Sequence, residues 1–352
     1  MARILPGPSN WKLILRRKTD SVTVLHAVTC DSHAVLPDRI LDLPVTELGP
    51  GAFSRQADIR EDAEEIWISN GALASHPVWS NETLHTLQLP PTIRAIQNLA
   101  FSNCRELSRL ELSDSIETWG SGIFSGCCKL LTFHIHCSGP ACSATAVWQI
   151  ARTLTGNLDI TVDGSGGPFR LIFPEYEEYE EENLITQAVL FSFHISGAGY
   201  PYHHCFTGRT LDLFRYDSTW REFMALNYQP LDAVRIAFWR LFYPVGLLEQ
   251  HQAAYLQFLR SHTDLALTWL TQTRNSDGFP SFSAKPSPKK TRCAVPALWP
   301  GPSATRRAPP FCWRHCTSGS RLHKLRHLIC NNFPYFVHMH FRRKRSARKS
   351  SR

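Results

Sequence analysis

The stretch LHTLQLPPTIRAIQNLAFSNC at 84–104 has the same pattern of apolar residues as LSRLELSDSIETWGSGIFSGC at 107–127, and LLTFHIH at 130–136 begins that pattern again. Equivalent positions lie 23 residues apart each time. A fixed period of about 20–30 residues is typical of solenoids, in which each unit buries its apolar face only against its neighbours. Seven classes of position keep the step: Leu84, Leu107 and Leu130; Leu87, Leu110 and Phe133; Leu89, Leu112 and Ile135; Ile93 and Ile116; Ile96 and Trp119; Phe101 and Phe124; Cys104 and Cys127.

The order of these positions is L-x-x-L-x-L, then I-x-x-I, then A-F-x-x-C or I-F-x-x-C. It resembles a leucine-rich repeat, and more narrowly the bacterial surface-antigen (BspA-like) class. The resemblance covers roughly residues 34–136 and implies units of strand, tight turn, second short extended piece and a turn containing Ala-Phe. Residues 34–53 resemble the first, capping unit of this class, with P-V-T-E-L at 44–48 and G-A-F at 51–53.

The segments before and after the repeats do not keep the repeated apolar pattern. Residues 1–20 are predicted to be a polar lead-in, and Ile66 and Ile68 indicate the strand that precedes the one at Leu87. After the repeats we expect a helix at 144–154 and a hairpin of strands 158–162 and 169–173 that closes the end of the solenoid. The acidic run at 175–182 is interpreted as a solvated boundary segment or as a docking patch for a basic partner.

Helical periodicity begins after residue 217. Asp217 or Ser218 is suited to cap a helix that ends near Leu226, and Pro230 suits the first turn of the next helix, which Pro244 ends. The apolar stripes of these helices, and of a third capped at Thr263-Asp264, indicate a helical core: Leu231, Val234, Phe238 and Leu241; Leu248, Tyr255, Phe258 and Leu259; Leu265 and Trp269.

The net charge of +8 averages two unlike parts of the chain. Residues 276–352 contain seventeen Lys or Arg and one acidic residue, a net charge of +16, whereas residues 1–275 carry 21 basic and 29 acidic residues, a net charge of −8. Because this tail has no apolar period, we expect it to be disordered; its abrupt onset also fits an out-of-frame translation. A basic run at 342–345 beside aromatic residues makes nonspecific nucleic-acid binding the alternative function.

These patterns predict an α+β chain with four parts: a lead-in (1–20), a short leucine-rich repeat solenoid of parallel strands with its end cap (21–165), a small helical domain (166–275) and a disordered basic tail (276–352). No signal-peptide pattern and no apolar stretch of about 18 residues is found, so we expect a cytoplasmic protein with reduced cysteines and no membrane span. The family resemblance also allows surface exposure, and the oligomeric state is not indicated.

Three motifs of the chain resemble catalytic or metal-binding sites. D-G-S-G-G-P at 163–168 resembles the G-D-S-G-G-P of trypsin-like proteases, but two residues are transposed, and a glycine turn explains it. The Cys and His pairs at 312–316 and 323–327 lie too close together for a zinc finger. His134 and His136 point to one face of a predicted strand, where they could meet a metal, but two surface imidazoles are favoured. We therefore predict no cofactor, no metal and no enzymatic activity.

Leucine-rich repeat proteins commonly bind partners along the concave face formed by the parallel strands. In L-x-x-L-x-L the leucines point inward, so the residues between them point outward. The sequence therefore predicts a protein-interaction module with an unidentified protein partner, anchored by Trp67 and Arg109, residue types that dominate binding hot spots. The predicted binding residues are Trp67, Gln88, Arg109, Glu111, Thr132, His134 and His136, with Trp67, Gln88, Glu111 and His134 in one row.

Overall fold

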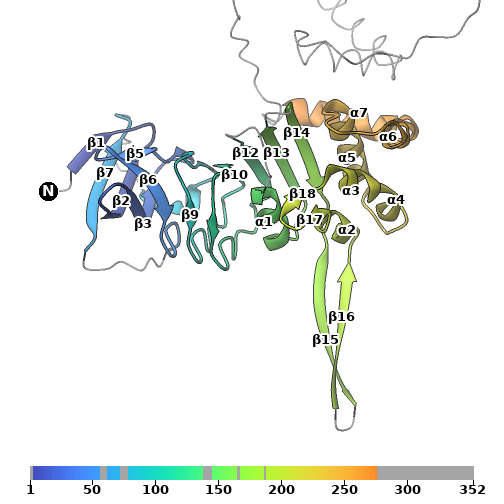
Figure 1. Ribbon diagram of the computed structural model, residues 1–352, viewed down its shortest axis with the longest axis horizontal. Coiled ribbons are helices and arrows are strands. Elements are labelled where there is room, and N and C mark those ends of the chain that lie inside the picture. The colour runs from blue at the N-terminus through green and yellow to red at the C-terminus, as the bar shows by residue number, and fades with distance from the viewer. Residues whose placement is uncertain are drawn as a thin grey trace, which may run out of the picture. The chain divides into compact units, whose positions relative to one another are not determined.

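The computed structural model of the protein (Figure 1) describes residues 3–55, 62–71, 78–137, 145–164, 167–185 and 188–275. The chain divides into two compact units, Met1–Ser261 and His262–Arg352. In the second unit the described residues form one helix, α7 (Thr263–Asn275), which begins where its predicted cap lies. Among the described residues, no helix is both long and apolar enough to cross a membrane.

The repeats form a parallel β-solenoid of about five turns, as expected. One of its sheets has six strands in the order β14-β13-β12-β10-β8-β4. Leu110 pairs with Leu87 on one side and Phe133 on the other, so residues one repeat step of 23 apart lie opposite each other in neighbouring strands. The strands are β4 (His33–Val35), β8 (Thr86–Gln88), β10 (Arg109–Ser113), β12 (Thr132–His136), β13 (Leu158–Gly164) and β14 (Gly167–Phe173); only β14 runs antiparallel to its neighbour.

The second sheet contains the short extended pieces of each unit. Its order is β1-β7-β2-β3-β6-β9-β11, with β5 paired to β6. Residues 34–53 supply both β4 and β6, so they stack directly on the unit at 84–104, as the resemblance implied. The strands are β1 (Arg3–Pro6), β2 (Trp11–Arg17), β3 (Val22–Thr29), β5 (Arg39–Ile40), β6 (Leu43–Leu48), β7 (Glu64–Ser69), β9 (Ala95–Ile96) and β11 (Thr118–Trp119); a single 3-10 turn, η1, spans Asn81–Thr83.

The repeated apolar positions lie between the two sheets. Leu84, Leu87, Leu107, Leu110 and Leu130 are each 0% exposed. Phenylalanines stack from unit to unit, with ring centroids 5.0 Å apart for Phe53 and Phe101 and 5.8 Å apart for Phe101 and Phe124. Because these side chains contact the equivalent residues of the next unit, each unit completes its core only with its neighbours.

Cys104 and Cys127, at equivalent positions of the repeats, are buried free thiols, in keeping with the expected reduced cysteines. Burial raises the pKa of Cys104 to about 12 and that of Cys127 to about 11, so neither thiol is ionised at neutral pH. Cys137 is disulfide-bonded, so the expectation of reduced cysteines does not hold for that residue.

The polar lead-in predicted for residues 1–20 is wrong for residues 3–17, which form β1 and β2. Trp11, Leu13 and Leu15 are almost fully buried and alternate with the half-buried Lys12 and Ile14, so one face of β2 packs into the core. It pairs with β3 and β7 and closes the N-terminal end of the solenoid. The apolar residues at 11–15 are a strand signal, but Lys12 and the basic run at 16–18 conceal it.

The other end of the solenoid is closed as predicted. Helix α1 (Thr145–Thr153) precedes β13, which adds to the sheet beside β12, and β14 completes an antiparallel hairpin. Most of the acidic run at 175–182 lies in β15 (Glu177–Ile185), which pairs with β16 (Ala188–Ser196) in a separate two-stranded sheet.

Small helices follow the hairpin and pack beside β14 (Figure 1). The predicted cap at Asp217 or Ser218 is wrong, because both residues lie inside α3 (Leu213–Ser218), which Asp212 caps, and α4 (Trp220–Phe223) follows Thr219. Asp217 is buried in an ion pair with Arg240. Pro230 begins α5 and Pro244 lies just beyond its end, as predicted. These elements are α2 (Tyr200–His203), β17 (Phe206–Thr207), β18 (Thr210–Leu211), α3 (Leu213–Ser218), α4 (Trp220–Phe223), α5 (Pro230–Phe242) and α6 (Glu249–Ser261).

The predicted stripes of these helices are mostly buried, but Leu231 and Leu248 are 40% and 45% exposed. The predicted disordered tail, its nucleic-acid binding and the Cys and His pairs within it lie outside the described residues.

Candidate functional site

The solvent-facing side of the six-stranded sheet has polar side chains between the buried leucines. Along β10 and β12 the side chains alternate between buried and partly exposed, as the L-x-x-L-x-L pattern predicted. The strand register places Gln88, Glu111 and His134 in one row. Six of the seven predicted binding residues share this surface, which we call the polar face: Gln88, Arg109, Glu111, Thr132, His134 and His136.

The seventh, Trp67, is not on the polar face. It lies on β7, which pairs with β1 and β2 in the other sheet, and β8 pairs instead with β4. The residue that continues the row beyond Gln88 is Val35. The sequence led to the wrong strand because β7 has the same apolar alternation as a repeat strand but closes the end of the solenoid.

An ion-pair network occupies the centre of the polar face. Arg109 donates two hydrogen bonds to Oε1 of Glu111, from Nε at 3.0 Å and from Nη2 at 2.7 Å. His134 and His136, on the next strand, have ring centroids 4.2 Å apart. Nδ1 of His134 lies 4.0 Å from Oε1 of Glu111, and Nε2 of His136 lies 3.8 Å from Oε2.

These contacts shift the ionisation of both partners. The His136 imidazole, with help from Arg109, lowers the pKa of Glu111 to about 2, and Glu111 in turn raises the pKa of His136. Glu111 is therefore a carboxylate at any physiological pH. A partly buried carboxylate, an arginine and two imidazoles therefore form the charged centre of the polar face.

Asp163 also contacts His134 and His136, and it was not predicted as a site residue, because the sequence pattern assigned it only to a glycine turn. It lies on β13, opposite His136 in the register, and its Oδ2 is 2.8 Å from Nε2 of His134 and 3.7 Å from Nδ1 of His136. The repeat gave no signal for it, because Asp163 lies 27 residues after His136 and the repeat step is 23 residues. Glu111, His134 and His136 each offer one donor atom within 4.8 Å of the others, a grouping able to hold a metal ion.

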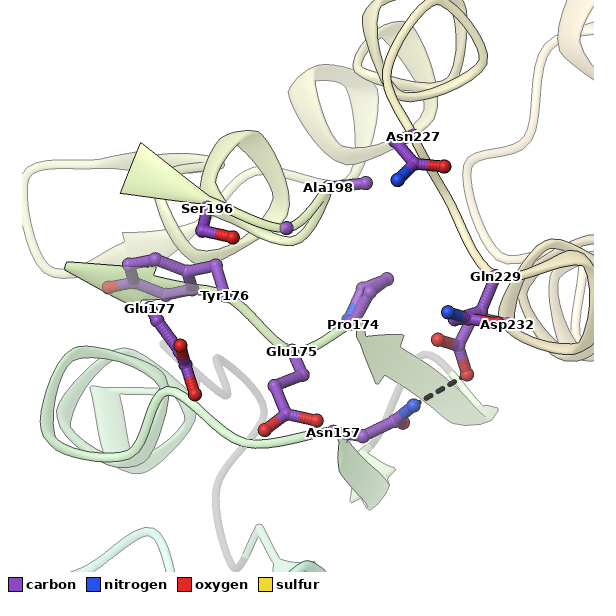
Figure 2. A pocket seen from close by; sticks show the side chains of 11 residues that line it. Asn157, Pro174, Glu175, Tyr176, Glu177, Ser196, Ala198, Asn227, Gln229 and Asp232 are labelled. Carbon is purple, nitrogen blue, oxygen red and sulfur yellow. Dashed lines mark hydrogen bonds between the residues drawn. The ribbon is translucent and has the colours of Figure 1, made fainter. Parts of the chain in front are cut away.

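A second candidate site is a pocket of about 360 Å³ at the base of the β15–β16 hairpin. Figure 2 shows Glu175, Glu177 and Asp232 among its lining residues, with Asn157 donating a hydrogen bond of 2.5 Å to Asp232. Three carboxylates favour a cationic group. Desolvation raises the pKa of Tyr176, which is buried beside them. The lining residues come from segments far apart in the sequence, including β15, β16 and α5, so no sequence motif predicts this pocket.

Residues 75–142 match the family model described as "BspA type Leucine rich repeat region (6 copies)". The match falls on the same repeats that form β8 to β12. Searches of the curated proteins and of the solved structures found no match. Leucine-rich repeat regions are typically noncatalytic, and the family favours a protein-interaction module.

Proposed function

We propose that this chain, in which residues 75–142 form a BspA-type leucine-rich repeat region, is a noncatalytic module that binds a protein partner on its polar face. The observation that carries the proposal is the register of that face. Adjacent strands bring Gln88, Glu111 and His134 into one row, and Arg109 and Thr132 into the next. A rigid sheet therefore presents a fixed set of polar groups to a partner.

The chemistry of the polar face supports recognition of a partner. The side chains in each row differ in charge and shape, whereas a structural ladder can repeat one residue. Arg109 is 40% exposed and held by Glu111, so binding would not have to order a free arginine side chain. Arginine is among the residues enriched in binding hot spots, and Arg109 replaces Trp67 as the main anchor of the proposed surface.

The rigidity of the scaffold also supports the proposal. The leucines directly beneath the polar face are fully buried, and each strand is paired on both sides. Side chains mounted on such strands are positioned more tightly than side chains on loops.

The test introduces bulk and charge on the polar face without touching the core. A Gln88→Arg, Thr132→Arg double variant alters two solvent-facing positions, and Thr118→Arg on β11 of the other sheet is the matched control. Pull-downs from the native cell should recover the same partners with wild type and with Thr118→Arg. The double variant, shown to be equally folded by circular dichroism, should lose them. Equal recovery by all three proteins would place the binding site elsewhere.

A further inference from the structure

The two imidazoles of β12 lie between two carboxylates, one from each neighbouring strand. Glu111 on β10 is opposite His134 in the register, and Asp163 on β13 is opposite His136. Each imidazole therefore directs one ring nitrogen towards Asp163 and the other towards Glu111. His134 does so at 2.8 Å and 4.0 Å, and His136 at 3.7 Å and 3.8 Å.

We propose that Glu111, His134 and His136 bind a divalent transition-metal ion of the zinc class, and that Asp163 orients the two imidazoles. Imidazoles that ligate a metal usually donate their other N–H to a carboxylate, which fixes the ring and raises its basicity. Oδ2 of Asp163 is placed for that role towards both rings. This leaves Nδ1 of His134 and Nε2 of His136 facing Glu111, so three donors converge from two strands.

The distances are compatible with this assignment. Bonds of about 2.0–2.2 Å to zinc put the donors of a tetrahedral site about 3.4 Å apart. Nε2 of His136 lies 3.8 Å from Oε2 of Glu111, and the donor atoms of Glu111, His134 and His136 all lie within 4.8 Å of one another, so side-chain rotations that draw these atoms together form the site. Arg109 occupies Oε1 of Glu111 through both of its hydrogen bonds. Oε2 is therefore the oxygen that binds the metal.

The donor set selects the class of ion. Two imidazole nitrogens and one carboxylate oxygen suit zinc and its neighbours in the transition series, whereas calcium and magnesium prefer oxygen ligands. The side chains of His134 and His136 are 22% and 43% exposed, so a fourth coordination position faces solvent and is open to water or to a donor group of another molecule. This inference does not rest on partner binding by the polar face.

The test is calorimetric titration of the full chain, first stripped with a chelator, using zinc chloride as the probe. The chain has other Cys and His residues, so the readout is the difference between variants. We expect His134→Ala, His136→Ala to remove one equivalent of bound zinc. The matched control is His33→Ala, His85→Ala, a second pair of exposed imidazoles with ring centroids 6.5 Å apart, which should keep every equivalent.

Two conservative variants test the site even if the double histidine variant does not fold. Glu111→Gln should weaken zinc binding at this site at least tenfold, and Asp163→Asn should weaken it about 10–100-fold, as expected for an orienting carboxylate. Calcium chloride added in excess should not compete. The proposal is overturned if the double histidine variant binds as much zinc as the control pair, if Glu111→Gln leaves the affinity unchanged, or if calcium displaces the zinc.

Discussion

Replacing Leu110 with alanine tests whether the repeats hold the protein together. Leu110 is 0% exposed and lies between Leu87 and Phe133 on its two partner strands. The substitution removes three buried carbon groups, worth about 0.8 kcal/mol each, so the transfer term alone is about 2.4 kcal/mol. The neighbouring side chains are held by their own strand pairing and cannot fill the space, so the cavity should bring the total to roughly 2–5 kcal/mol.

Thermal unfolding followed by circular dichroism measures this loss, with the urea midpoint as a second readout. A loss of that size should lower the melting temperature by at least about 4 °C in a unit of this length. The matched control is Leu99→Ala, the same change in the same repeat region at a side chain that is 49% exposed; it should cost less than half as much. A shift of less than 1–2 °C for Leu110→Ala, on the same scale, or equal shifts for both variants, would refute the assigned register.

Three further predictions concern the C-terminal part of the chain. Asp217 and Arg240 are fully buried together, so Asp217→Ala should cost about 3–5 kcal/mol in urea unfolding, and adding Arg240→Met should recover part of that loss. Burial lowers the pKa of His203, so folding stability should fall as pH drops below about 6.5, and the fall measured by urea unfolding should be smaller in His203→Gln. A chain that ends at Arg274 should keep its circular dichroism spectrum and melting temperature and lose most of any salt-sensitive nucleic-acid binding, and unfolding of that shorter chain would show that the tail packs.

The solenoid was predictable because its apolar residues recur at a fixed step in the sequence. Leucines 23 residues apart require that successive strands stack in parallel with the same residues inward, and the observed pairing of Leu87, Leu110 and Phe133 follows directly. The N-terminal cap was not predictable by the same logic, because β2 and β7 close the end of the solenoid and have no counterpart at the repeat step. Their alternation gives the strand but not its partner, which is why Trp67 was placed in the wrong sheet.

The polar face was predictable in its rows but not in its contacts. The step of 23 residues aligns Glu111 with His134. It does not extend to Asp163, because the insertion before β13 changes the spacing, so the second carboxylate became visible only in the fold. For Asp217 the local sequence was misleading. It favoured a helix cap, but the side chain forms a buried ion pair with Arg240, 23 residues away.

The most direct test of partner binding by the polar face is site-specific photo-crosslinking in the native cell. A photoreactive residue is placed at Gln88 on the polar face in one protein and at Thr118 on the other sheet in a second protein. If the polar face binds the partner, position 88 gives a discrete crosslinked adduct and position 118 gives none. An adduct from position 118 alone, or adducts of equal yield from both positions, would contradict binding by the polar face.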